Sequence, residues 1–194
     1  MTTTDTTMET VEETEAPRRR RTVLWASIAV GVIVAIVAIA VGTRPAAGTH
    51  QTASPLIGHP VPLGPGQLVT GAPFSPDSLH GQWALVNFFA TWCIPCQHEH
   101  SELVAFSRRH AGDAQVVSVV FQDDTSHVTS FFAQHGGDWP VVRDPAGRTA
   151  LDFGVTGVPE SYLVDPNGIV VARLVGGVQA DALDVLLQQA KARA

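Results

Sequence analysis

The chain has 194 residues, of which 45% are hydrophobic, so it is long enough for one domain of ordinary size and an additional terminal segment. Its net charge of −6 and the lack of a basic stripe argue against a nucleic-acid-binding surface. The two cysteines, Cys93 and Cys96, would close a loop too short to stabilise the fold much as a disulfide, which favours redox chemistry or metal ligation.

The first 42 residues are expected to form a cytoplasmic tail and a membrane anchor. Residues 1–21 are rich in Thr and Glu and end in four consecutive arginines, so we expect a disordered tail. A transmembrane helix is expected at 22–42, because the nineteen residues from Val23 to Val41 are almost wholly apolar and would form a helix ~29 Å long, close to the thickness of a bilayer's hydrocarbon core. The arginines before it predict a single-pass membrane protein, with its N-terminus in the cytoplasm and its C-terminal domain outside.

A cleaved signal peptide is the alternative for this segment. Ala38-Ile39-Ala40 fits a small-x-small cleavage site, but the apolar run and the leader before it are longer than usual, which favours an uncleaved anchor. Both interpretations export the rest of the chain. We expect a small, polar linker at 43–54 and a folded domain at 55–194, whose Pro- and Gly-rich start is irregular with one edge hairpin.

The core of this domain is expected to begin with a strand, a helix and a second strand. The almost continuous apolar run at 83–89 is typical of a strand buried on both faces. Residues 99–110 lack Gly and Pro and are expected to be helical, and the apolar run at 115–121 predicts a second buried strand. This order predicts a right-handed parallel unit.

The C-terminal half alternates helical and strand patterns. A strong hairpin turn, Asp165-Pro166-Asn167-Gly168, separates two of the strands. The fold class is therefore expected to be α/β, with a central mixed sheet covered by helices on both faces. The expected helices are 125–135, 148–153 and about 179–192, and the expected strands are 139–142, 161–164 and 169–175.

The cysteine pair lies at the junction of the first strand and the first helix, where dithiol redox sites are found. A thiol at a helix N-terminus is favoured as the thiolate by the helix dipole, so Cys93 is the expected attacking sulfur. Cys96, one turn further, is the expected resolving sulfur. Pro95 suits the first helical turn, where a missing N–H costs little.

A metal site is the alternative role for the pair, with His98 and His100 as further ligands. Two helical residues that are two positions apart point roughly 160° apart, so the four side chains cannot converge on one ion. No metal and no other cofactor is therefore expected, and both histidines are expected on the solvated surface.

Glu99 shares a helical stripe with Cys96, because Cys96, Glu99 and the apolar residues after them fall within roughly an 80° arc. A buried carboxyl there would have a raised pKa and could exchange a proton with the resolving thiol. A solvated carboxyl at the edge of the stripe is equally compatible with the pattern.

Two motifs resemble those of a known family. F-x-A-T-W-C-x-P-C-x-x-E from Phe88 to Glu99 and G-V-x-G-V-P-E-S-Y-L-V-D-P-N-G from Gly154 to Gly168 are similar to the extracytoplasmic thioredoxin-like proteins of the TlpA/ResA/DsbE (CcmG) group. The stretch from Val116 to Asp124 resembles the DsbE branch. The resemblance implies a thioredoxin-like fold that covers about 55–192.

The resemblance also implies roles for individual residues. Pro159 would be a cis-proline that faces the cysteines, and the backbone of Val158 would pair with an extended substrate chain. Trp92, within the first motif, is expected to contact the substrate too. Glu99 matches the family's active-site acid, and Glu160 matches the acid after the proline, a possible tuning residue together with Pro95.

The expected activity is therefore thiol–disulfide exchange. The family implies reduction of a disulfide in apocytochrome c or its chaperone, with electrons from a membrane thiol transporter of the CcdA or DsbD type. An oxidase that forms disulfides in exported proteins is an alternative, since the direction depends on the reduction potential. Another is a non-catalytic copper-handling protein for oxidase assembly, with His127 or His135 as a distant ligand.

Overall fold

The computed structural model describes Trp25, residues 28–33 and residues 50–194. The chain divides into two compact units, Met1–Ala46 and Ala47–Ala194. Residues 28–33 are helical, and no helix within the described residues is long and apolar enough to cross a membrane. The expected cytoplasmic tail, the proposed cleavage site and most of the expected anchor and linker lie outside the described residues.

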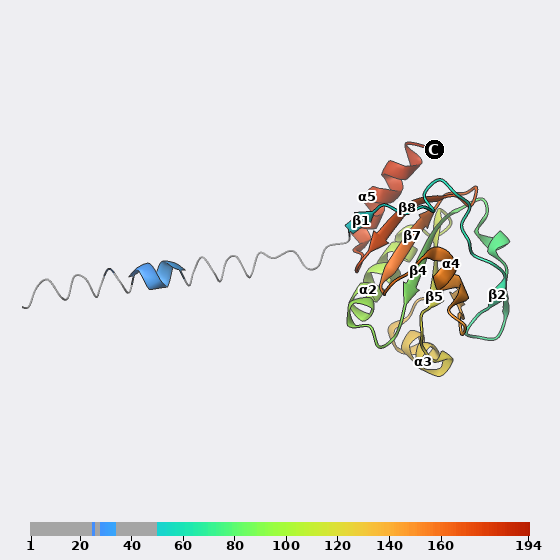
Figure 1. Ribbon diagram of the computed structural model, residues 1–194, viewed down its shortest axis with the longest axis horizontal. Coiled ribbons are helices and arrows are strands. Elements are labelled where there is room, and N and C mark those ends of the chain that lie inside the picture. Colours follow the sequence, from blue (N-terminus) through green and yellow to red (C-terminus); the bar gives the residue numbers. More distant parts are fainter. Residues whose placement is uncertain (1–24, 26–27, 34–49) are drawn as a thin grey trace, which may run out of the picture. The chain divides into compact units, whose positions relative to one another are not determined.

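The second unit is built on a six-stranded mixed sheet (Figure 1). The three strands β4, β5 and β6 run parallel, whereas β7 pairs antiparallel with β4, β8 with β7 and β1 with β8. Their order across the sheet is β1 (His50–Thr52), β8 (Val170–Val175), β7 (Glu160–Val164), β4 (Trp83–Phe89), β5 (Ala114–Val120) and β6 (Val141–Val142).

Strand β4, helix α2 (Ile94–Arg109) and strand β5 form the parallel unit that the sequence predicts. All residues of β4 are buried, as its apolar run requires of a central strand. Helix α2 begins five residues before the Gly- and Pro-free run from which it was predicted, because Cys93 is its N-cap and Pro95 fits its first turn. The cysteine pair therefore lies where the central strand ends and the helix begins.

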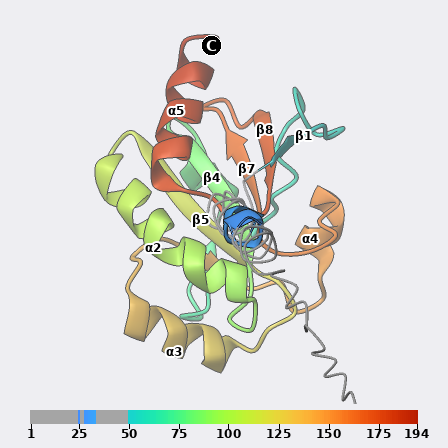
Figure 2. The same cartoon turned by 90° about the vertical axis from the view of Figure 1, so that its left-hand side faces the viewer.

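Helices cover both faces of the sheet, as expected (Figure 2). Residues alternate between the faces along each strand, so that Leu85 and Phe89 belong to one apolar cluster and Val86 and Phe88 to the other. The first cluster packs against α2, α3 (Thr125–His135) and α5 (Ala180–Lys191). The second packs against α4 (Arg148–Phe153) and the 3₁₀ turn η1 (Pro76–Leu79).

Two differences from the sequence-based expectation concern short strands. Part of the segment expected to be a linker forms β1, which pairs with β8 along the edge of the sheet. An edge strand with exposed side chains needs only backbone pairing, so it leaves no apolar pattern. The expected hairpin near the start of the domain is a separate pair, β2 (Gly66–Gln67) and β3 (Pro73–Phe74).

The turn between β7 and β8 is the predicted hairpin. Asp165 accepts hydrogen bonds from the N–H groups of Asn167 and Ile169 at 2.8 and 2.9 Å, and Gly168 has the positive φ of 80° that the turn requires. The hairpin pairs β8 with β7. Strand β7 begins directly after the loop that contains Val158 and Pro159.

Candidate active site

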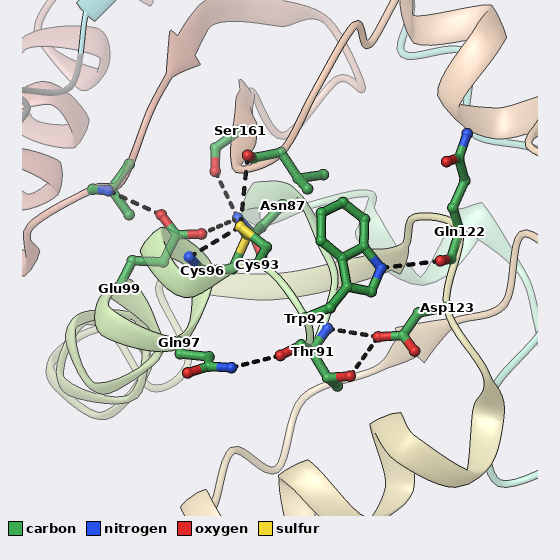
Figure 3. The surroundings of a disulfide bond; sticks show 12 residues. Asn87, Thr91, Trp92, Cys93, Cys96, Gln97, Glu99, Gln122, Asp123 and Ser161 are labelled. Carbon is green, nitrogen blue, oxygen red and sulfur yellow. Dashed lines mark hydrogen bonds between the residues drawn. A yellow bond between two sulfur atoms is a disulfide. The ribbon is translucent and has the colours of Figure 1, made fainter.

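Cys93 and Cys96 form a disulfide at the N-terminus of α2, and both side chains are buried (Figure 3). Cys93 has an extended backbone, and its Sγ accepts a hydrogen bond of 3.2 Å from the N–H of Cys96. The sulfur thus takes the place of a capping oxygen at the helix N-terminus. The same position stabilises a thiolate once the disulfide is reduced.

The loop before β7 faces this disulfide. The Val158–Pro159 peptide bond is cis, and the carbonyl oxygen of Val158 lies 3.5 Å from the Sγ of Cys93. Pro159 is buried and Val158 is half-buried. The loop therefore places a backbone carbonyl beside the first cysteine, at the position that the family resemblance implies.

Glu99 is 3% exposed, on the face of α2 that carries Cys96. Its Oε1 accepts a hydrogen bond from Nδ2 of Asn87, and its Oε2 accepts one from the N–H of Val178, both at 2.9 Å. Burial raises the pKa of Glu99 to about 7, although both hydrogen bonds act in the opposite direction. The carboxyl is therefore in the core rather than solvated, and it changes its charge near neutral pH.

Asn87 and Ser161 extend this buried polar group across two strands, and sequence reasoning missed both. The two residues face each other in the register of β4 and β7, and Nδ2 of Asn87 donates to Oγ of Ser161 at 3.0 Å. Asn87 Oδ1 is buried without a hydrogen-bond partner among the described residues. The available signal was the single amide in an otherwise apolar strand, since a buried polar side chain needs a partner.

Trp92 is the exposed aromatic residue of the site, with 56% of its surface accessible beside the buried Cys93. Ile94, on the other side of this cysteine, is 58% exposed. Single exposed apolar residues are common on protein surfaces, but two that flank a buried disulfide give the site an apolar rim.

Glu160 is buried, but it is not part of the polar group that Glu99, Asn87 and Ser161 form. It is 1% exposed, and Nε of Arg173 donates to its Oε1 at 2.6 Å while the hydroxyl of Tyr162 also donates to it. Because side chains alternate along β7, Glu160 lies on the opposite face of the sheet from Ser161. Its carboxylate is paired on the side away from Glu99.

The expectation that both histidines are solvated is wrong for His100. His98 is exposed, but His100 is 5% exposed, because the rings of Phe131, Phe132 and Trp139 pack around it. A hydrogen bond of 2.9 Å links its Nε2 to the carbonyl of Gly136. Within residues 25, 28–33 and 50–194, no three His, Cys, Asp or Glu side chains are grouped to hold a metal.

A mixed sheet, a C-x-x-C pair that caps a helix and a cis-proline loop beside it define a thioredoxin-like thiol–disulfide protein. The chain belongs to the Redoxin family, whose family model matches residues 57–186, and within it to the DsbE-like thiol:disulfide interchange proteins. The predicted thioredoxin-like α/β fold is thereby confirmed.

Individual relatives agree with this assignment. The thiol:disulfide interchange protein DsbE of Allochromatium vinosum is 32% identical over 148 residues, which cover 72% of this chain and 78% of that protein. CycY of Rhizobium leguminosarum bv. viciae, also a thiol:disulfide interchange protein, is 35% identical over 100 residues, so the chain spans 53% of its length.

A solved structure gives the same result. The crystal structure of a DsbE-type thiol:disulfide interchange protein from Chlorobium tepidum is 31% identical and superposes with a TM-score of 0.62. The match covers 70% of this chain and 96% of that one. Together with the Cys93–Cys96 pair, these relatives identify the chain as a thiol–disulfide oxidoreductase.

Proposed function

We propose that the protein is a membrane-anchored, extracytoplasmic reductant of cytochrome c maturation, which reduces a disulfide in apocytochrome c or its chaperone. The observation that carries the proposal is the disulfide at the N-terminus of α2 with a buried carboxyl on the same helix face. The thiol:disulfide interchange relatives and the resemblance of the motifs to the DsbE branch support it.

The exchange would start from the reduced protein. The thiolate of Cys93 attacks one sulfur of the substrate disulfide, which forms a mixed disulfide and releases the other substrate sulfur as a thiolate. Cys96 then attacks Sγ of Cys93, which forms the Cys93–Cys96 bond and releases the second substrate sulfur. The substrate gains two electrons and, with two protons, two thiols.

Glu99 is the proposed proton acceptor of the second step. Cys96 must lose its proton before it attacks, and it is 3% exposed, so a buried base must take that proton in place of water. A carboxyl with a pKa of about 7 is suited to that task near neutral pH. Asn87 and Val178 would hold the carboxylate in place through their two hydrogen bonds.

The substrate is proposed to lie in extended form against Val158 and Pro159, with Trp92 on the other side of Cys93. The proximity of the Val158 carbonyl to Sγ of Cys93 supports this placement. Pro95 would tune the pair by fixing the first turn of α2. Glu160 would act indirectly, because its contacts with Arg173 and Tyr162 support the strand that follows Pro159.

We further propose that residues 22–42 anchor the protein in the plasma membrane and that a membrane thiol transporter of the CcdA or DsbD type reduces the disulfide after each turnover. The apolar composition of 22–42 and the preceding arginines support the anchor. A reductant outside the cytoplasm needs such a donor, because its electrons must be brought across the membrane.

Substitution of the resolving cysteine tests the roles and the substrate together. Cys96→Ala is expected to accumulate a mixed disulfide through Cys93 in cells, because the second step is lost. Non-reducing electrophoresis and mass spectrometry of the captured partner should identify an apocytochrome c or its chaperone.

Cys93→Ala and the double alanine variant are the matched controls and should capture nothing. Capture by the Cys93→Ala variant alone would show that the roles of the two sulfurs are reversed. Capture only of exported proteins unrelated to haem attachment would contradict the proposed substrate.

A further inference from the structure

Thr91, between β4 and α2, has all of its polar groups bound (Figure 3). Its N–H and its hydroxyl both donate to Oδ2 of Asp123, each at 2.6 Å. Its carbonyl accepts a hydrogen bond of 2.7 Å from Nε2 of Gln97. The peptide that leads into Trp92 and Cys93 is therefore fixed on both sides.

Trp92 is held at its indole although its ring is exposed. Its Nε1 donates to the carbonyl of Gln122 at 3.1 Å. Gln122 has a φ of 47°, the only positive value for a non-glycine residue in the part of the chain that the structure describes. A side chain makes that conformation unfavourable, so the turn is maintained by its contacts.

Asp123 is the centre of this arrangement, with a side chain that is 3% exposed. Its Oδ1 accepts a hydrogen bond of 2.7 Å from the N–H of Asp124 and lies 3.5 Å from Nδ1 of His127. Burial acts to raise the pKa of Asp123, but the hydrogen bonds from Thr91 and Asp124 outweigh it and lower the pKa. The carboxylate is thus ionised at neutral pH and bound by several donors.

The strand order explains why these residues meet. Strands β4 and β5 are parallel neighbours with Phe89 opposite Val120, so the residues that follow each strand emerge at the same edge of the sheet. The turn after β5 therefore lies beside the loop that carries Cys93. No local sequence pattern around the cysteines contains this contact.

We propose that Gln122 and Asp123 are positioning residues that hold Trp92 as a preformed wall beside Cys93, against which an apolar side chain next to the substrate's disulfide packs. This inference rests on the proposed contact between Trp92 and the substrate. An unrestrained exposed indole would lose side-chain freedom when substrate binds, whereas a restrained one has already lost it. The residues would therefore act on substrate binding rather than on the chemistry of Cys93.

The test compares Asp123→Ala with Asp124→Ala in the full-length protein. Asp124 is the matched control, because it is the adjacent carboxyl, it is exposed, and its side chain makes no capping hydrogen bond. Exchange is measured with a peptide disulfide that carries apolar flanking residues and with hydroxyethyl disulfide. Both directions of exchange are followed, so the comparison does not depend on whether the protein is a reductant in cells.

Asp123→Ala is expected to raise the KM for the peptide about two- to tenfold, the effect of ordering one side chain on binding. Its kcat for the peptide and its rate with hydroxyethyl disulfide should stay within twofold of the wild type, and Asp124→Ala should match the wild type throughout. Acrylamide quenching of Trp92, isolated by subtraction of a Trp92→Phe variant, should increase in Asp123→Ala only.

A milder pair of variants keeps the test valid if Asp123→Ala disturbs the fold. Thr91→Val removes one donor to Asp123 and should raise the peptide KM in the same direction, whereas Thr91→Ser should restore it. Equal losses with the peptide and the small disulfide would overturn the inference, because Asp123 would then act on Cys93 itself. An unchanged peptide KM in both Asp123→Ala and Thr91→Val would overturn it as well.

Discussion

Glu99 shows how one buried side chain can couple the protein's stability to pH. Its burial costs free energy when it is ionised, and the hydrogen bonds from Asn87 and Val178 recover only part of that cost, so its pKa is raised to about 7 from an ordinary 4.5. If the side chain had only a structural role, a glutamine at this position would cost less free energy to bury than an ionised glutamate. A buried carboxyl on the helix face that carries Cys96 fits the proposed role of Glu99 as a proton acceptor.

Glu99→Gln is expected to remove a pH dependence of stability. Because the folded pKa is above the unfolded one, the contribution of protonated Glu99 to stability is fully present below pH 4.5 and is lost as the pH rises through about 7. The shift corresponds to a loss of about 3 kcal/mol in the free energy of unfolding. Urea unfolding of the oxidised wild type and of the variant, in steps from pH 4.5 to 8, measures the difference.

The free energy of unfolding of the wild type should therefore fall relative to that of Glu99→Gln as the pH rises across that range. Parallel curves for the wild type and Glu99→Gln would mean that Glu99 titrates like a solvated carboxyl. The result would then contradict its proposed role with Cys96.

At the scale of elements, strand β7 connects the cis-proline loop of the site to a buried ion pair. Pro159 precedes the strand, Glu160 begins it, and Arg173 of β8 pairs with Glu160 from the neighbouring strand. The side chain of Glu160 is 1% exposed and that of Arg173 is 19% exposed, so water does little to screen the pair.

Arg173→Ala is expected to destabilise the fold by about 3 kcal/mol, because it leaves a buried carboxylate without its counter-ion. Arg148→Ala is the matched control: its partner is Asp152 on the same helix, and its side chain is 77% exposed, so a loss below about 0.5 kcal/mol is expected. Denaturant unfolding of both variants checks this. Equal losses in the free energy of unfolding would show that the buried ion pair of Arg173 stabilises the fold no more than the exposed pair of Arg148.

The elements could be predicted from the sequence to a large extent, because their signals are local. Apolar runs and helical spacing located the central strands and the last helix to within one or two residues, and the turn at 165–168 was predicted from its residues. Strand β1 could not be predicted, because its three residues are mostly exposed and carry no apolar pattern, and they join the sheet by pairing with β8.

Residue spacing predicted the site only where its residues are close in sequence, and the distant Val158–Pro159 loop was expected from the family resemblance alone. Cys96 and Glu99 share one helix, so spacing alone placed them on one face, and the C-x-x-C motif placed Cys93 at the start of that helix. Asn87, Ser161 and Asp123 join the site through strand order and register, which no local pattern gives. His100 was expected on the surface because the covering rings come from α3 and the loop after it.

At the scale of the whole molecule, the fold places the cysteine pair at the end of a buried central strand and surrounds it with loops from three other parts of the chain. The turn after β5 holds Thr91 and Trp92, the loop before β7 faces Cys93, and the segment before α5 contacts Glu99. Each loop contacts a different residue of the site, so we propose that sulfur chemistry, proton transfer and substrate contact can be altered separately.

The direction of electron flow is a property of this whole assembly, and it decides between a reductant and an oxidase. For a two-electron couple, about 30 mV corresponds to about 1.4 kcal/mol, so modest stabilisation of one redox state reverses the direction. The most direct test is the reduction potential of the Cys93–Cys96 couple in the full-length protein, together with its redox state in cells by alkylation. We predict a potential nearer that of thioredoxin, about −270 mV, and a largely reduced pair in cells. A potential near that of the oxidant DsbA, about −120 mV, with a largely oxidised pair would contradict the account.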